Sequence, residues 1–273
     1  AAQSLNTTDF RSTTETKFGK LSRFWKYYVT AGLDLDYHRM HNSLAGLGEF
    51  DNSGIHEAFL SNIYATPQMD YERNRWRASL HVPLKWQHYS VDGQHDYINT
   101  SPQLYLKRQF TAKSDFSASV AYSLRTPQPY LSFTAPVLSD YRNLFIAENP
   151  DKYSHNMAAS ISYRYRNPMK SLFFNLSTTY NHSRSSIMSN QLFIGDFIIS
   201  TYADRLHHSN TWSISGGFSK GLGHSKMVVG CDVNVSASSS SSMRDNSAIP
   251  YRQATAGMKP YFKGSICRWI SAN

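Results

Sequence analysis

Histidine is the residue type in this chain with the widest chemical repertoire, since its imidazole ring binds metal ions and transfers protons near neutral pH. Eleven histidines occur among the 273 residues. The nearest pairs along the chain are His38 and His41, His81 and His88, and His207 and His208. Adjacent residues of an extended strand point to opposite faces, so His207 and His208 cannot easily share an ion. We therefore predict solvated histidines, no metal site and no cofactor.

Serine, histidine and aspartate together could form a hydrolytic site if three such side chains converged. All three types are plentiful, but no nucleophile elbow or other local motif marks a reactive serine. Serine also solvates the polar face of a strand, and the serine run at 238–242 is typical of the polar end of a strand that enters a loop. The sequence thus predicts a protein that is not an enzyme.

These residues lie in segments whose polarity alternates with a period of two. In residues 26–40, KYYVTAGLDLDYHRM, apolar side chains occupy the odd positions, and two carboxylates and an imidazole lie on the even ones. The same alternation recurs at 76–86, 115–125, 156–166 and 226–238. Because successive side chains of a β-strand point to opposite faces, each segment presents one apolar and one polar surface.

A two-faced sheet buries its apolar face in a soluble protein but turns it toward lipid in a membrane barrel. A soluble β-sandwich would use shorter strands and a core rich in Val, Ile and Leu. Here the strands are long and the apolar stripes often end in tyrosine or tryptophan, which fits two interfacial girdles. No run approaches the ~18 apolar residues of a membrane helix. We therefore predict an all-β fold, an antiparallel up-and-down transmembrane β-barrel.

The barrel prediction assigns a side to the residues of the alternating segments. Facing lipid, we expect Val29, Leu33, Leu35, Leu80, Val82, Leu84, Val120, Ile161, Val229 and Val233. Facing the lumen, we expect the polar residues Asp34, Asp36, His38, Arg77, His81, Lys85, Arg164, Arg166 and Asp232. At the membrane interfaces, we expect the aromatic residues Tyr27, Tyr37, Trp76, Trp86, Tyr163 and Tyr165.

About ten or eleven strands are expected in all. They lie near 27–41, 56–71, 75–90, 96–110, 115–125, 154–166, 171–193, 198–220, 225–242 and 249–264, with a weaker strand near 8–20. Short links at 72–75, 111–114, 166–171 and 221–224 alternate with longer ones at 42–55, 126–153 and 243–248 and with briefer ones near 90–95 and 194–197. Tight periplasmic turns and larger extracellular loops alternate in this way in outer-membrane barrels.

The net charge bears on the choice of partner. Lys and Arg number 28 against 19 Asp and Glu. The charges are scattered, and no zinc-ligand spacing, helix-turn-helix pattern or basic helix accompanies them, so we expect no nucleic-acid partner. A lumen or surface that meets anionic groups is the use that we expect for the basic excess.

The longest link, residues 126–153, keeps aromatic and aliphatic side chains where a merely solvated loop would be polar. Ser139 or Asp140 could cap a short helix through DYRNLFI. Structured loops of this length often carry function. The candidate ligand contacts are Tyr130, Phe133, Tyr141 and Phe145. The alternative is a loop whose apolar side chains pack only against one another and bind no ligand.

The two cysteines are expected to be free thiols. If the last hairpin is centred near residue 245 or 246, position 231 pairs with about position 260. Cys267 then lies seven residues further along, which is over ~20 Å from Cys231 at ~3.3 Å per residue.

Two runs, NMAASISYRYRNPMKSLFFNLSTTYNHSRSSIMSNQLFIGDFIISTY and SISGGFSKGLGHSKMVVGCDVNVSASSSSSMRDN, resemble the barrel of TonB-dependent outer-membrane receptors. The resemblance is strongest to those with a carboxypeptidase-regulatory-like N-terminal extension. The YRYRNPMKSLFFN hairpin and the SKGLG turn carry it, and it extends over most of residues 20–270. It implies a barrel of about 22 strands, plugged by an N-terminal domain, that imports a ligand with energy from the inner membrane.

The sequence departs from that family in showing no plug domain, energy-coupling box, signal peptide or terminal aromatic residue. We therefore expect residues 1–273 to be a barrel segment, incomplete at both ends, in the outer membrane of a Gram-negative cell. The implied partners are outer-membrane lipid, the missing plug, the TonB energy-coupling protein, a surface lipoprotein and an unidentified small nutrient ligand. The alternative is a passive porin, or a small self-contained barrel for transport or adhesion.

Overall fold

The computed structural model describes residues 2–46, 52–90, 94–125, 137–138, 140, 142–146, 154–223, 227–267 and 270–272. Almost all of these residues belong to one 16-stranded sheet, as the alternating sequence predicts. The helical structure among them is a single 3-10 turn, Pro168–Lys170. None of the described residues belongs to a helix that is long and apolar enough to cross a membrane.

The strands are long where the sequence alternates without interruption. Their bounds are β1 Ala2–Leu21, β2 Trp25–Ala45, β3 Asn52–Arg73, β4 Trp76–His81, β5 Leu84–Ser90, β6 Gln94–Thr100, β7 Gln103–Thr111, β8 Ser114–Arg125, β9 Val137–Leu138, β10 Asn143–Phe145, β11 Ser154–Asn167, β12 Leu172–Ile194, β13 Phe197–Gly221, β14 Val228–Arg244, β15 Ser247–Cys267 and β16 Ile270–Ala272.

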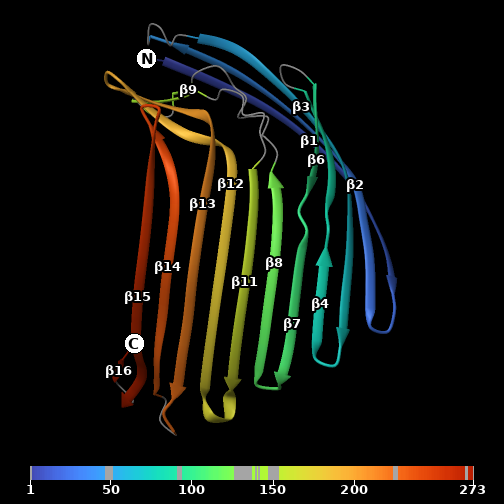
Figure 1. Cartoon of the computed structure of the whole chain (residues 1–273), viewed down its shortest axis with the longest axis vertical. Helices are drawn as coiled ribbons and strands as arrows, with labels where there is room; N and C mark the ends of the chain where they lie inside the picture. Colours follow the sequence, from blue (N-terminus) through green and yellow to red (C-terminus); the bar gives the residue numbers. More distant parts are fainter. Residues whose placement is uncertain are drawn as a thin grey trace.

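Neighbouring strands pair antiparallel in the order β1-β2-β3-β4-β7-β8-β11-β12-β13-β14-β15-β16. Figure 1 shows β4, β7, β8 and β11 to β15 side by side, while the upper ends of β1 and β2 lean across the sheet toward β9. We call the end of the sheet with the β3–β4 and β11–β12 turns the lower end, and the end with β9 the upper end. The up-and-down antiparallel order confirms the predicted fold class.

The turns at both ends contain residues with positive φ. At the lower end, Asn74 and Arg75 have φ of 49° and 68°, which is the two-residue turn that matches the twist of a hairpin. At the upper end, Asp245 and Asn246 have φ of 47° and 62° and join β14 directly to β15. The expected longer link at 243–248 is therefore wrong, because both strands continue almost to the turn. The link expected at 42–55 also shortens, since β2 ends at Ala45 and β3 begins at Asn52.

Prolines interrupt two strands that the sequence predicted to be continuous. The expected strand at 75–90 is divided into β4 and β5 at Pro83, and the one at 96–110 into β6 and β7 at Pro102. Proline has no backbone N–H to donate to a neighbour. The carbonyls still bond: Pro83 accepts from Ser101 N at 3.3 Å and Pro102 accepts from Tyr122 N at 2.9 Å.

Among the described residues, burial is concentrated in two small clusters rather than in one core. The first contains Ala58, Tyr89 and Tyr97, on β3, β5 and β6. The second contains Leu44, Leu144 and Ile199, at the upper end of the sheet. Elsewhere many large apolar side chains are exposed, because a single layer of sheet has nothing packed against one of its faces.

Candidate functional site

The sheet has two chemically different faces. We call the face that carries Asp34, Ser119 and Ser213 the inner face, and the opposite one the outer face. Alternation along each strand and the register between neighbouring strands determine which residues share a face. At the upper end, Leu144 of β10 lies over the inner face, where it contacts Leu44 of β2.

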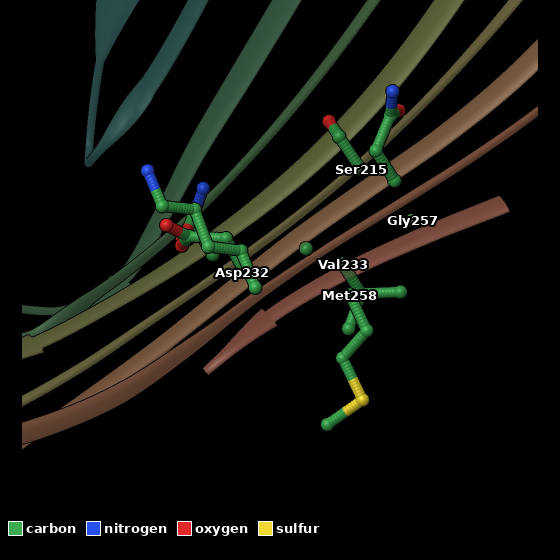
Figure 2. Close-up of a pocket in the computed structure, with 9 residues that line it drawn as sticks. Ser215, Asp232, Val233, Gly257 and Met258 are labelled. Atoms are coloured by element: carbon green, nitrogen blue, oxygen red, sulfur yellow. The ribbon is translucent and has the colours of Figure 1, made fainter. Parts of the chain in front are cut away.

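Figure 2 shows this division near the C-terminal edge, where Ser215 and Asp232 project to one side of the sheet and Met258 to the other. The polar residues predicted to face a lumen share the inner face: Asp34, Asp36, His38, Arg77, His81, Lys85, Arg164, Arg166 and Asp232. Most residues predicted to face lipid share the outer face: Val29, Leu33, Leu35, Leu80, Leu84, Val120, Ile161, Val229 and Val233. Val82 lies in the break between β4 and β5.

The outer face carries aromatic residues toward both ends of its apolar stripe. The predicted interfacial residues Tyr27, Tyr37, Trp76, Trp86, Tyr163 and Tyr165 all lie on it. Sequence reasoning missed a second group on the C-terminal strands, namely Tyr122, Tyr180 and Trp212. Their parity along the strands is the signal that would have identified them.

The inner face of the N-terminal strands is crowded with charged and amide groups. Lys85 is half-buried and lies near Asp34 and Arg11, which carry opposite charges. Asn62 and Gln87 are buried on the neighbouring row, opposite each other on β3 and β5. This part of the inner face is filled by its own side chains.

A close approach on β2 helps to fill that face. The Tyr64 ring lies beside Gly32, and its hydroxyl donates to Glu15 Oε2 at 3.0 Å. A Cβ on Gly32 would lie 2.5 Å from the Tyr64 ring and 2.5 Å from the Thr14 carbonyl oxygen. Glycine at position 32 therefore permits a hydrogen bond that spans three strands.

An ion-pair group lies between the two halves of the inner face. Arg164 donates to Asp115 Oδ1 from Nε at 3.1 Å and from Nη2 at 3.0 Å. Lys107 Nζ lies 3.8 Å from the same oxygen. Asp115 is largely buried by these partners, and charge-assisted hydrogen bonds of this type are stronger than neutral ones.

Beyond this group the inner face changes to rows of hydroxyls. One row crosses six strands, each residue opposite the next: Ser119, Ser160, Thr179, Ser213, Ser236 and Thr255. Its hydroxyls bond in pairs, Ser119 to Ser160 at 2.7 Å, Thr179 to Ser213 at 2.6 Å and Ser236 to Thr255 at 2.6 Å. Such short side chains leave the inner face open along this row.

Next to these rows lies a shallow depression of about 470 Å³. Figure 2 shows Ser215, Asp232 and Gly257 among the residues that line it. It combines hydroxyl, carboxylate and exposed backbone groups. It could therefore form hydrogen bonds to a polar partner laid along the wall, but it offers no enclosed cavity.

A second structural unit crosses the upper end, and we call it the bridge: β9, β10 and the tip of the β12–β13 hairpin, residues 187–204. β10 pairs in parallel with β13, where Ile146 N donates to Ser200 O at 2.9 Å. β10 pairs also with β9, and Leu138 N of β9 donates to Gln3 Oε1 of β1 at 3.1 Å. The hairpin tip pairs in turn with the end of β14. Hydrogen bonds thus connect β14 to β1 across the upper end.

An apolar cluster fixes the bridge to the sheet. Leu144 is fully buried between Leu44 of β2 and Ile199 of β13. Between β2 and β13 the sheet order contains β3, β4, β7, β8, β11 and β12, so two distant strands share one cluster. The sheet must therefore be strongly curved, with the bridge on its concave side.

Of the four predicted ligand contacts in the loop at 126–153, the structure describes one. Tyr130, Phe133 and Tyr141 lie outside the described residues. Phe145 lies in β10, where its ring packs edge-on against Tyr202 with centroids 5.8 Å apart. The expected short helix through DYRNLFI is wrong, because residues 143–145 form a strand.

Asp140 does act as a capping residue, but it caps a turn before a strand. Its Oδ1 accepts from the backbone N–H groups of Arg142 and Asn143, both at 2.9 Å. The backbone N–H of Arg142, followed by the side chain and backbone of Asn143, holds the pKa of Asp140 below its usual value. The turn therefore favours a charged carboxylate.

Several of the described histidines contact acids, amides, hydroxyls or each other at separate places on the sheet. His38 contacts Asp9, and His88 Nδ1 lies 2.8 Å from Asp96. The rings of His182 and His208 stack 5.8 Å apart. Within the described part of the chain, no three His, Cys, Asp or Glu side chains are placed to hold a metal ion.

Comparison with known proteins identifies the fold. No protein-family profile and no curated protein sequence matches the chain. Among solved structures, the copper transporter OprC aligns with a TM-score of 0.66 at 9% identity, over 97% of this chain and 50% of its own. The ferric enterobactin receptor PfeA of Pseudomonas aeruginosa, in complex with enterobactin, aligns with a TM-score of 0.52 at 12% identity, over 97% of this chain and 47% of its own.

The chain therefore spans about half the length of the solved structures that it matches. These neighbours are TonB-dependent receptors, transport proteins rather than enzymes. The predicted resemblance to the barrel of such receptors is confirmed at the level of fold. The chain has the all-β, antiparallel fold of a receptor barrel of the outer-membrane type.

Proposed function

We propose that this chain forms part of the wall of an outer-membrane receptor barrel, which admits a small nutrient ligand in a TonB-dependent manner without changing it chemically. The observation that carries the proposal is the opposite chemistry of the two faces of a curved sheet. A polar concave face and an apolar convex face are what a water-filled barrel in lipid requires.

The outer face supplies a membrane-spanning belt. On β12, Phe174 and Tyr180 lie on this face at the two ends of the apolar stripe. The six steps between them correspond to about 20 Å along the strand, which is close to the height of the apolar band of such barrels. The upper end, which carries the bridge, would face the outside of the cell.

The two edges of the sheet support a larger barrel. Among the described residues, β1 pairs with β2 alone, and β15 pairs beyond β14 with β16 near its end only. Unpaired backbone groups in lipid cost several kcal/mol each, so we propose that further strands of the same barrel cover both edges. If β4 with β5 and β6 with β7 each count as one, the described strands that cross the sheet are about half of 22.

The open hydroxyl rows support a polar domain inside the barrel. Short side chains on β8 and β11 to β15 leave room along the inner face, and paired hydroxyls can exchange partners with backbone amides at little cost. We propose that a plug occupies this space and that the TonB protein and a surface lipoprotein act on the assembled receptor. The ligand is a small nutrient that passes between the plug and this wall.

A passive porin is the second candidate. The charged inner face around Lys85, Asp34 and Arg164 favours it, because facing charges line the constriction of many ion-conducting pores. Conductance separates the two candidates. In a planar bilayer bathed in potassium chloride, a plugged receptor stays closed, whereas a porin conducts steadily.

Cysteine labelling tests the proposal at the level of the membrane. In the protein that contains this chain, with Cys231 and Cys267 replaced by serine, Ser213→Cys would lie on the inner face and Ile214→Cys on the outer face. In outer membranes, a water-soluble maleimide should label Ser213→Cys, and a lipid-soluble quencher should reach a label on Ile214→Cys only. Equal labelling and quenching at both positions would contradict a membrane-spanning wall.

A further inference from the structure

We propose that the upper end of the outer face on β11, β12 and β13 binds the phosphate groups of an outer-leaflet lipid. This inference rests on the proposed function, because it requires the outer face to lie in the membrane with its upper end toward the outside. The occupant is a phosphorylated glycolipid of the outer leaflet, held by its head group and by one of its acyl chains.

Three basic residues form one row on this face. Arg184 of β12 lies opposite His155 of β11 on one side and opposite His208 of β13 on the other. Neighbouring strands are ~4.8 Å apart, so the row spans about 10 Å. The row lies just above Tyr180 and Trp212, at the level where lipid head groups meet an aromatic girdle.

The row has no acidic counterpart on its own face. The outer-face positions of the neighbouring strands contain no Asp or Glu over 114–124, 155–167, 172–184, 208–220, 229–239 and 252–262. Asp204, the next acid along β13, lies beyond the bulge between Ser185 and Ile187. Arg184 and Arg252 form no salt bridge with any described residue. Cations at the edge of a membrane without a protein counter-ion attract lipid phosphates.

The N-terminal strands provide the contrast. There, on the same outer face, Arg39 Nε lies 3.3 Å from Glu57 Oε1, and His88 Nδ1 lies 2.8 Å from Asp96 Oδ1. Each of these basic residues has a carboxylate directly opposite on the next strand. On the upper part of this face, Arg39 and His88 therefore have carboxylate partners, whereas Arg184 forms no salt bridge with a described residue.

The side chains around the row are already held in place. Asn210 Oδ1 accepts from the Tyr180 hydroxyl at 3.1 Å and lies 2.7 Å from His182 Nδ1. The His182 ring stacks on His208 with centroids 5.8 Å apart. Fixed partners lower the entropy that binding would cost, so this end of the face is organised for a ligand.

A shallow depression below the row offers a place for an acyl chain. It has a volume of about 380 Å³, and Tyr180, Trp212, Ala237 and Ala254 form its apolar lining. The alanines sit opposite each other on β14 and β15, where larger residues would fill the space. Arg252 is part of the lining at its upper rim. An acyl chain in this depression would place its phosphate near Arg252 and the basic row.

The test compares two lipids on the protein that contains this chain, purified in detergent. Thermal unfolding is measured with diphosphorylated lipid A and with the same lipid after dephosphorylation. We expect the phosphorylated lipid to raise the unfolding midpoint more. The double variant R184Q with H208Q should bind it about tenfold more weakly, since the charged contact of Arg184 and the ring N–H contact of His208 are lost.

The double variant R39Q with H88Q is the matched control, because it removes one arginine and one histidine from the same face where both are paired. It should bind the phosphorylated lipid as the wild type does. Equal shifts with both lipids, or wild-type binding by R184Q with H208Q, would overturn the proposal. Flotation of each variant with outer membranes tests the proposed function separately. A protein that floats with the membranes but shows no preference for the phosphorylated lipid would contradict the lipid site and leave the proposed function in place.

Discussion

On β2, β3 and β5 the inner face carries carboxylates, amides, a lysine and a tyrosine, whereas on β8 and β11 to β15 it carries mainly serine and threonine. In the charged half, side chains such as Tyr64 reach across neighbouring strands and fill the concave side. The hydroxyl half satisfies itself through short pairs at 2.6 to 2.7 Å and leaves space.

The outer faces differ in the complementary way. Arg39 and His88 of the N-terminal strands lie against carboxylates, whereas Arg184 and Arg252 of the C-terminal strands form no salt bridge with a described residue. The same sheet thus has one half whose inner face is crowded with charged and amide groups. The other half keeps room on its inner face and carries arginines on its outer face that form no salt bridge with a described residue. Contacts with partners would then be concentrated on β8 and β11 to β15, where the sequence of the inner face is mainly serine and threonine.

The largest expected effect comes from breaking the link between the two halves. Leu144 is fully buried between β2 and β13, so Leu144→Ala should destabilise the docking of the bridge by about 2–5 kcal/mol. Hydrogen exchange at the amides of Leu138 and Ile146 measures it. Leu5→Ala, at a side chain that is 51% exposed, should leave those amides protected. Unchanged protection in Leu144→Ala would show that the halves are not joined through this residue.

The crowding of the charged half can be compared with the room in the hydroxyl half by adding one methyl group to each. In Gly32→Ala the new Cβ would lie 2.5 Å from the Thr14 oxygen, and we expect a loss of about 1–3 kcal/mol in the free energy of unfolding. In Gly257→Ala, on the inner face of β15, the nearest atom is the Asn234 carbonyl oxygen at 4.0 Å, an ordinary contact. Urea unfolding of the two variants should therefore differ, and similar losses would remove this part of the contrast.

Hydrogen bonds of the two kinds should also differ in strength. Arg164→Ala removes two bonds to a largely buried carboxylate, so we expect a loss of about 1–2 kcal/mol, reduced by the exposure of the arginine. Ser160→Ala removes one neutral bond to Ser119 and should cost about 0.5–1 kcal/mol. Chemical denaturation at low and high salt measures both. Only the Arg164 effect should weaken with salt, and salt dependence in Ser160→Ala would contradict the assignment.

The smallest expected effect is a pH dependence of the bridge. The folded pKa of Asp140 lies below its unfolded value, so the turn at residues 140–143 is fully stabilised above about pH 4 and loses this contribution as pH falls through the lower folded pKa. Proteolysis of the bridge should rise over that acidic range. Asp140→Asn keeps a hydrogen-bond acceptor without a charge, so proteolysis of the bridge should depend less on pH in this variant. If the pH dependence of proteolysis is unaltered, another titrating group causes it.

Period-two alternation predicted the strands well, because face identity is a local property of a strand. It also placed Cys231 opposite position 260, and the register pairs Cys231 with Pro260. The breaks at Pro83 and Pro102 were missed, although both prolines are visible in the sequence, because alternation continues through Pro83 without a change of parity.

The bridge could not be predicted, because its parts are distant in sequence. The aliphatic residues of the segment at 126–153 indicated burial, but nothing local indicates that Leu144 would meet Leu44 or that residues 143–145 would pair with 198–200. The rows of hydroxyls are likewise a property of register. Each serine alone is typical of a solvated strand, and only the alignment of six strands brings them together.

The parallel pairing of β10 with β13 also fixes the order of assembly. Residues 143–145 precede their partners 198–200 in the chain, and Leu138 bonds to Gln3 across 135 residues. Closing such long loops is slow compared with forming the hairpins between them. The bridge must therefore form after β11, β12 and β13 have paired. Protection of its amides from hydrogen exchange would then indicate that the pairing of these strands is complete.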